Sequence, residues 1–198
     1  MALTAAPSTG DTRLRILDSA FESIRDMGLG RTTMEDVART AGVSRQTVYR
    51  YFPSRDHLIL ALVLREEDRF LTGVRTAFSE TADLEDACRQ SFLFCLRFAR
   101  EHPLLDRLLA TDPETLLPYL TTRAGPVLAR AREVLIELLA SKAWVRAGLL
   151  EQAADTGVRM AVSYALAPPS RPDDEVARDL ARILTGALTG KTRKEARP

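Results

Sequence analysis

Apolar residues recur at helical spacing along nearly the whole chain, and glycine and proline interrupt that spacing at intervals. Ile16, Ala20 and Ile24 fall on one face of a first helix, which Gly28 and Gly30 end. No stretch alternates between apolar and polar residues for long enough to predict a strand. The sequence therefore predicts an all-α protein.

Capping residues divide the region that follows into short helices. Thr33 with Asp36 three positions later is a capping-box-like pair, and Gly42 ends that helix. Ser44 caps a third short helix, and Ser54 caps a fourth that runs long. Two short helices therefore stand between two longer ones.

The two short helices have the residues of a helix-turn-helix unit. Ala38 is small where the two backbones would approach, and Gly42 accepts the left-handed conformation at the turn. Val43, Val48 and Phe52 are spaced as apolar anchors beneath the second helix. This arrangement predicts an N-terminal three-helix, helix-turn-helix DNA-binding domain.

The second helix of this unit presents residues suited to reading DNA. With Val48 inward, Gln46 and Arg50 point almost directly outward, with Thr47 and Tyr49 at the flanks. Arginine pairs with guanine and glutamine with adenine, whereas threonine and tyrosine hydroxyls contact phosphate.

Charge is concentrated at the same place. The chain has 28 basic and 27 acidic residues, so its net charge of +1 gives no overall attraction to DNA. Residues 39–55, however, contain arginines and no acid. The expected contacts with double-stranded operator DNA are Thr33, Ser44, Arg45, Gln46, Thr47, Tyr49, Arg50, Tyr51 and Arg55. Among them, Thr33, Tyr49, Tyr51 and Arg55 are expected to hold phosphates.

Four short motifs resemble the TetR family of transcriptional regulators. They are TTMEDVA at 32–38, AGVS at 41–44, TVYRYF at 47–52 and SRDHL at 54–58. The resemblance covers about residues 13–62, and Arg55 stands where the family usually has lysine. It implies a homodimeric, ligand-responsive regulator, most often a repressor released from a palindromic operator by a small effector. It also implies that a C-terminal helical domain binds the ligand and forms the dimer.

The expected organisation has four segments. They are a flexible arm at 1–10, the helix-turn-helix domain at 11–57, a ligand-binding and dimerisation domain at 58–190 and a basic tail at 191–198. The longest apolar run is 58–64, too short to span a membrane, and residues 1–10 lack the pattern of a secretion signal. We expect a cytoplasmic protein.

Apolar residues of the C-terminal region are candidates for lining the effector site. The candidates are Phe92, Cys95, Phe98, Leu105, Leu109, Tyr119 and Met160. An aromatic-rich helix is more often simply core. If these residues do line a site, they favour a small lipophilic effector.

The last two long helices are the expected dimer interface. Their apolar and small residues recur at helical spacing: Ala154, Gly157, Val158, Ala161 and Ala165, then Val176, Leu180, Ile183, Leu184, Ala187 and Leu188. Two such helices from each subunit would form a four-helix interface. The alternative is that both stripes cover the chain's own core.

Other functions have weaker support. The sequence lacks a nucleophile elbow, a dinucleotide fingerprint and the ligand spacing of a metal site, so we expect neither an enzyme nor a cofactor. A redox response through Cys88 and Cys95 is an open alternative, which would require an exposed thiol of low pKa. A DNA-binding architectural protein is disfavoured by the length of the C-terminal region.

Overall fold

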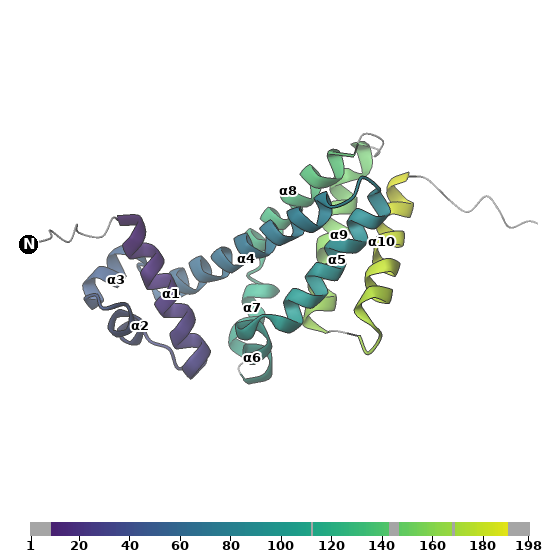
Figure 1. Ribbon diagram of the computed structural model, residues 1–198. Helices are drawn as coiled ribbons and strands as arrows, with labels where there is room; N and C mark the ends of the chain where they lie inside the picture. Colours follow the sequence, from purple (N-terminus) through teal and green to yellow (C-terminus); the bar gives the residue numbers. More distant parts are fainter. Residues whose placement is uncertain (1–8, 112, 143–146, 168, 190–198) are drawn as a thin grey trace, which may run out of the picture. The chain divides into compact units, whose positions relative to one another are not determined.

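The structure is a computed structural model that describes residues 9–111, 113–142, 147–167 and 169–189 (Figure 1). It is helical and has no strand in these ranges, which confirms the all-α prediction. The helices are α1 (Thr9–Met27), α2 (Met34–Ala41), α3 (Arg45–Tyr51), α4 (Arg55–Ser79), α5 (Leu84–Glu101), α6 (Pro103–Thr111), α7 (Pro113–Leu120), α8 (Gly125–Ala140), the 3-10 turn η1 (Ala147–Leu149), α9 (Leu150–Leu166) and α10 (Asp173–Thr189).

Helix α1 begins at Thr9, within the segment expected to be a flexible arm. The remainder of that segment, residues 1–8, and the expected basic tail at 191–198 lie outside the described residues.

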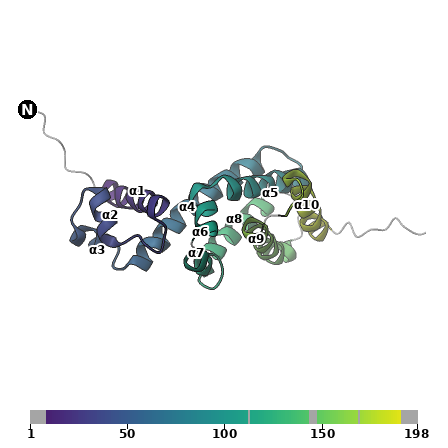
Figure 2. The same cartoon turned by 90° about the horizontal axis from the view of Figure 1, so that it is seen from below.

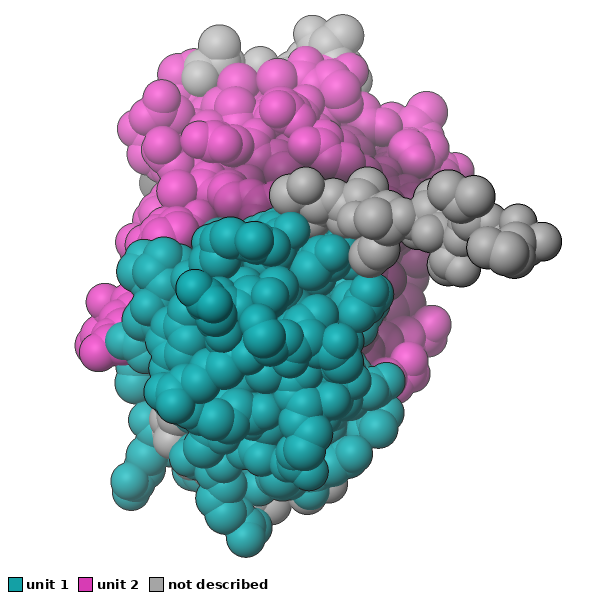
Figure 3. All heavy atoms as spheres, turned by 90° about the vertical axis from the view of Figure 1, so that its left-hand side faces the viewer, with its two compact units in different colours: residues 1–66, 103–119 teal, residues 67–102, 120–198 magenta. Residues whose placement is uncertain are grey.

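The chain divides into two compact units, coloured separately in Figure 3. Unit 1 comprises residues 1–66 and 103–119, and unit 2 comprises residues 67–102 and 120–198. Helix α4 therefore begins in unit 1 and ends in unit 2, and α6 packs against α1 within unit 1. The expected domain boundary at 57/58 follows chain order, whereas these units follow packing. Unit 1 therefore holds the helix-turn-helix together with half of α4, all of α6 and all of α7 except Leu120.

Unit 1 has a small apolar core beneath the helix-turn-helix. Ile16 of α1, Val37 of α2 and Val48 of α3 are fully buried. Arg15 of α1 also donates a hydrogen bond from Nη2 to the backbone oxygen of Ala41 at 2.8 Å. These contacts join α1, α2 and α3 into the bundle seen in Figure 2.

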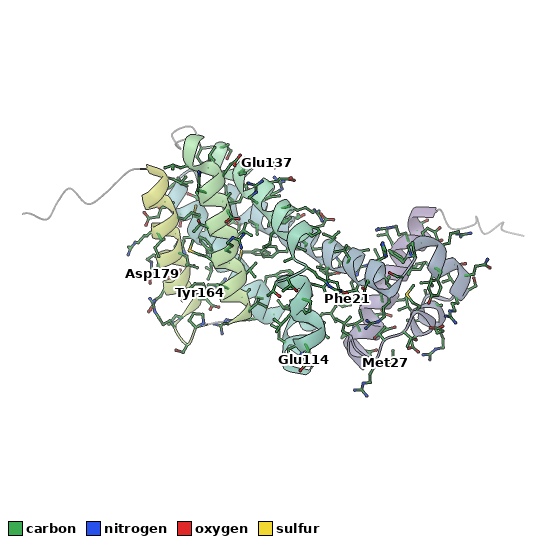
Figure 4. The ribbon with its side chains drawn as sticks, turned by 180° about the vertical axis from the view of Figure 1, so that it is seen from behind. Phe21, Met27, Glu114, Glu137, Tyr164 and Asp179 are labelled. Carbon is green, nitrogen blue, oxygen red and sulfur yellow. The ribbon has the colours of Figure 1, made fainter. Side chains whose placement is uncertain are left out.

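Unit 2 is built around the packing of α5 against α10. Its core residues are Phe78, Leu84, Ala87, Cys88, Phe92, Leu93, Leu96, Leu139, Ala153, Val176, Ala177, Leu180, Ala181, Leu184 and Leu188. Tyr164 of α9, labelled in Figure 4, packs against this cluster. Ion pairs from Arg89 to Asp174 and from Arg100 to Asp173, both 2.8 Å long, also join α5 and α10.

The apolar stripe of α10 faces the chain's own core. Leu180 and Leu184 are 2% and 3% exposed, so the prediction that they meet a partner subunit is wrong. In α9, a Cβ on Gly157 would lie 2.9 Å from Leu135 Cδ2 and 3.4 Å from Leu184 Cδ2. The small residue at 157 thus admits neighbouring helices of the same chain. Ile183 differs from its neighbours because it is 61% exposed.

Candidate DNA-binding interface

The helix-turn-helix begins with a complete capping box. The Asp36 backbone N–H donates to Thr33 Oγ1 at 3.2 Å, and the Thr33 N–H donates to Asp36 Oδ2 at 3.1 Å. Hydrogen bonds from Thr33 and then from Arg39 lower the pKa of Asp36. The predicted cap is confirmed, and the Thr33 hydroxyl that we expected to hold phosphate is already engaged in it.

The turn between α2 and α3 requires a left-handed residue. Gly42 has φ 63° and ψ 35°, and its N–H bonds to the backbone oxygen of Arg39 at 3.2 Å. A Cβ at this position would meet nothing within 4 Å, so the requirement for glycine is conformational and not one of space. This turn sets the direction of α3.

Helix α3 is fixed by a cap at one end and apolar burial at the other. The Thr47 N–H donates to Ser44 Oγ at 3.1 Å, which confirms Ser44 as the N-cap. Val48 is fully buried and Phe52 is 2% exposed, whereas Val43 is only half-buried. The Val48 side of α3 therefore packs against the core of unit 1.

The opposite side of α3 lies open. Arg45, Gln46, Tyr49 and Arg50 are exposed, and Thr47 and Tyr51 are half-buried. Because Gln46 and Arg50 are each two positions from Val48, they project on the side opposite the core, as predicted. These two side chains have the freedom to enter a DNA groove.

The arginines of this region are unequally available. Arg39 pairs with Asp36 at 2.6 Å, and Arg45 pairs with Glu35 at 2.5 Å. Arg45 also lies over the ring of Tyr49, 5.3 Å from its centre. Acids of α2 therefore offset part of the positive charge that the sequence concentrates between residues 39 and 55.

Arg50 has a different neighbour. Its guanidinium lies over the ring of Tyr51, 5.4 Å from the ring centre. An aromatic neighbour restricts the side chain but leaves its charge uncancelled. Among the four arginines between residues 39 and 55, Arg50 combines exposure with a position opposite the core.

Arg55 bonds to the backbone of the loop before α2. Its Nε donates to the Thr32 oxygen at 3.0 Å, and its Nη2 donates to the Leu29 oxygen. The side chain is half-buried. The sequence shows arginine here where the family usually has lysine, but it does not reveal these hydrogen bonds to the loop. They depend on the planar fork of donors that lysine lacks.

Comparison with known proteins supports the geometry. Residues 16–62 match the model of bacterial regulatory proteins of the tetR family. Residues 83–186 match the C-terminal domain model of the bacterial tetracycline repressor. The chain is a TetR-family transcriptional regulator. Its family is one of regulators and not of enzymes.

Relatives of this regulator extend over most of its length. The transcriptional regulator AlkX of Mycobacterium tuberculosis is 34% identical over 191 residues, covering 90% of this chain and 88% of AlkX. The crystal structure of the repressor AlkX from a Dietzia strain has a TM-score of 0.73 at 31% identity, covering 90% of this chain and 95% of that one. The regulator EthR of M. tuberculosis is 35% identical over 82 residues, 41% of this chain and 38% of EthR.

The candidate effector residues of the regulator fall in both compact units. Phe92 and Cys95 are buried in unit 2, and Met160 packs against the unit 2 core. Leu105, Leu109 and Tyr119 belong to unit 1, where Tyr119 is buried and its hydroxyl donates to Asp56 Oδ1 at 3.3 Å. Phe92 is thus a core residue, and Tyr119 binds α7 to the first turn of α4.

Phe98 belongs to an aromatic cluster of unit 2. Its ring centre is 5.1 Å from that of Phe70, 5.8 Å from that of Phe94 and 4.9 Å from that of His102. All four side chains are half-buried. The cluster therefore leaves aromatic surface accessible.

The two cysteines do not have the chemistry of a redox sensor. Both are buried, and burial raises the pKa of Cys88 and of Cys95 to about 12. A thiolate is the reactive form, and burial disfavours it here. The redox alternative loses its chemical basis.

Clustered metal ligands and membrane-spanning helices are both absent from the described ranges of the regulator. No three histidine, cysteine or carboxylate side chains gather there as metal ligands would. None of the helices in those ranges combines the length and the apolar character needed to cross a membrane.

Proposed function

We propose that this regulator is a repressor that binds a palindromic operator as a homodimer, through α3 of each subunit. The observation that carries the proposal is the open face of α3, where Gln46 and Arg50 lie opposite the buried Val48. Two such helices roughly 34–36 Å apart enter successive major grooves of DNA. Occupying the operator blocks transcription.

The contacts with DNA are divided between reading and holding. Gln46 and Arg50 read base edges, because glutamine and arginine match the major-groove edges of adenine and guanine. The side chains beside them hold the DNA backbone: Ser44, Arg45, Thr47, Tyr49 and Tyr51. Thr33 and Arg55 at the neighbouring helix starts join them by exchanging their present hydrogen bonds for phosphate. A bacterial regulator of this kind acts on DNA in the cytoplasm.

The operator is released when a small lipophilic effector binds. Helix α4 runs from the unit that contains α3 into the unit that contains the aromatic cluster, so a ligand that prefers another position of α4 shifts the population away from the DNA-bound form. The half-buried aromatic cluster around Phe98 favours an apolar ligand. The Dietzia relative is described as a repressor implicated in biodegradation of n-alkanes, which supports an apolar effector here.

The dimer forms through the outer surfaces of α9 and α10. Ile183 is the large apolar residue of α10 that its own core leaves exposed. In α9, Ala161, Val162, Ala165 and Leu166 are only half-buried. Apolar surface left open on two adjacent helices suits a four-helix interface between subunits.

Selection of bound DNA from a random pool tests the proposal. We expect an enriched palindrome whose half-site centres lie one helical turn apart. When the selection is repeated in the presence of candidate lipophilic molecules, only the effector should abolish enrichment of the palindrome. Enrichment of asymmetric or unrelated sequences would contradict the proposed operator.

A further inference from the structure

Glu67 stands in a row of buried apolar side chains. On α4, Leu71, Val74 and Phe78 follow it at the spacing of one helix face, and all are buried. Glu67 is itself 7% exposed, and its side chain is 5% exposed. Fully buried glutamates are rare unless another group pairs with them.

The ion-pair partner of Glu67 is distant and is shared with a second carboxylate. Arg130 of α8 approaches Glu67 Oε2 at 3.4 Å, and its other nitrogen contacts the exposed carboxylate of Asp68 more closely. Glu67 Oε1 is buried, and no hydrogen-bond donor of the described residues reaches it. A buried acceptor without a donor costs about 1–3 kcal/mol, so it calls for an explanation.

Charge decides which ligand group this oxygen suits. When Glu67 is ionised, it and Asp68 together carry two negative charges against the single positive charge of Arg130. Burial raises the pKa of Glu67 from 4.5 to about 7, against the opposing pull of Arg130. An anionic group would meet this excess negative charge, whereas a hydrogen-bond donor would satisfy Oε1.

Apolar surface for the rest of a ligand lies along the same helix. Phe70 follows Glu67 by one turn of α4, and its ring centre is 5.1 Å from that of Phe98 and 5.9 Å from that of Phe94. At Gly73, a Cβ would lie 2.1 Å from Phe94 Cζ, so glycine is needed for this ring to lie against α4. Aromatic surface beside one unsatisfied polar group is the composition of a small-molecule site.

We propose that Glu67 is the polar anchor of the effector site and accepts a hydrogen bond from an apolar molecule that bears one donor, a hydroxyl or an ammonium group. The inference rests on the proposed ligand response, since it names the class of effector. The aromatic cluster of Phe70, Phe94 and Phe98 holds the apolar part.

Direct binding of four eight-carbon probes to the full chain, without DNA, tests the anchor. The probes are 1-octanol, octylammonium, methyl heptyl ether and octanoate, and the readout is saturable thermal stabilisation. We expect 1-octanol or octylammonium to bind the natural chain at least tenfold more tightly than the ether, which accepts but cannot donate, and than octanoate, which is anionic.

Two substitutions of Glu67 separate the two donor types. Glu67→Met keeps the volume but removes the acceptor, so 1-octanol and the ether should bind it equally. Glu67→Gln keeps an acceptor oxygen but loses the charge, so a preference for octylammonium should disappear while a preference for 1-octanol remains. Both variants remove a buried charge, and Arg130 keeps Asp68 as its ion-pair partner in each, so no charge is left unpaired.

Glu137→Gln is the matched control, because Glu137 of α8 pairs with Arg75 of α4 at 2.8 Å on the exposed surface (Figure 4). It also breaks an ion pair between α4 and α8, yet the probe preferences should match those of the natural chain. Equal binding of 1-octanol and the ether to the natural chain, a preference retained in Glu67→Met, or no binding by any probe would overturn the inference. Binding through Glu67 that leaves operator affinity unchanged supports the anchor and refutes the proposed ligand response.

Discussion

At the scale of single residues, the side chains of α3 divide into those that are open to solvent and those that already have a partner. Gln46 and Arg50 are exposed opposite the core, whereas Arg45 is paired with Glu35 and lies over Tyr49. Releasing Arg45 to a phosphate requires exchange of an exposed ion pair, which costs little. On the proposed function, base reading therefore depends on Gln46 and Arg50, and Arg45 suits contact with the DNA backbone.

Arg50→Ala should reduce specific binding far more than non-specific binding. A bidentate arginine contact with guanine contributes about 1–3 kcal/mol of discrimination, so operator affinity should fall by that amount per half-site. Preference at one base position should relax as well. Titration of the selected operator and of scrambled DNA at several salt concentrations measures both effects.

Arg25→Ala is the control for Arg50→Ala, since Arg25 is an exposed arginine of α1 that pairs with Asp26 at 3.0 Å. It lowers the net charge equally without touching α3. Equal losses on operator and scrambled DNA in Arg50→Ala would show that Arg50 does not read bases.

Arg55→Ala should lower the free energy of unfolding of the regulator. It removes the donors that satisfy the carbonyls of Leu29 and Thr32, and the loss of charged hydrogen bonds costs about 1–3 kcal/mol. Arg55→Lys should recover less than half of this, because an ammonium lacks the fork that spans both carbonyls. Urea unfolding of the three proteins gives the comparison.

The same variants decide whether Arg55 also holds phosphate. A contact with phosphate would lower the salt dependence of DNA binding by roughly one unit in Arg55→Ala. If Arg55→Ala unfolds like the natural chain but binds all DNA weakly, then Arg55 does not hold the loop before α2 in the way that its hydrogen bonds indicate.

At the scale of helices, the sequence predicted those features that depend on residues a few positions apart. The caps at Thr33 and Ser44, the left-handed Gly42 and the inward Val48 all follow from local spacing, and the structure confirms each of them. A cap and its acceptor are three residues apart, so no knowledge of the tertiary fold is needed to recognise them.

Features that depend on what a helix packs against could not be predicted in the same way. The stripe of Leu180 and Leu184 shows that one face of α10 is buried, but the pattern is the same whether the cover is α5 or a second subunit. Arg55 and Glu67 likewise acquire their roles from residues more than 20 positions away. The spacing of residues along one helix does not predict which distant residues that helix will contact.

Helix α4 contains a titratable group that makes stability depend on pH. Glu67 has a pKa of about 7 in the folded chain against an ordinary 4.5, so the folded state holds the proton more tightly. The free energy of unfolding is therefore highest below pH 4.5 and falls by roughly 1.4 kcal/mol per pH unit between 4.5 and 7. The total loss is on the order of 3 kcal/mol and is complete once the pH has risen through 7. Arg130 limits the loss, and Asp68 adds to it.

The difference between the natural chain and Glu67→Gln isolates this effect. Between pH 5 and pH 8.5, the natural chain should lose stability relative to Glu67→Gln, whose amide does not titrate. Urea unfolding across that range is the measurement, with Glu137→Gln as the control for an exposed carboxylate. A constant difference at all pH values would mean that Glu67 is ordinarily solvated in the folded protein.

At the scale of the whole molecule, the proposed function requires that two copies present α3 to one operator. Three observations fit that requirement: the family match, the open face of α3 and the continuity of α4 between the compact units. Burial of Leu180 within its own core removes it from the proposed interface and leaves Ile183 as the exposed large apolar residue among the described side chains of α10. The two positions are three residues apart on one helix and have opposite surroundings.

Ile183→Asp and Leu180→Asp should therefore fail in different ways. A carboxylate at 183 meets solvent in the single chain, but in the dimer it would be buried with no opposite charge to pair with. We therefore expect a folded monomer that binds the operator at least tenfold more weakly. A carboxylate at 180 enters the α5–α10 core and should cost several kcal/mol, enough to unfold a domain of ordinary stability. Light scattering gives the mass, and circular dichroism with urea gives the folding. A folded Ile183→Asp protein that remains a dimer would move the interface away from α10, and a folded monomeric Leu180→Asp protein would mean that the stripe meets a second subunit after all.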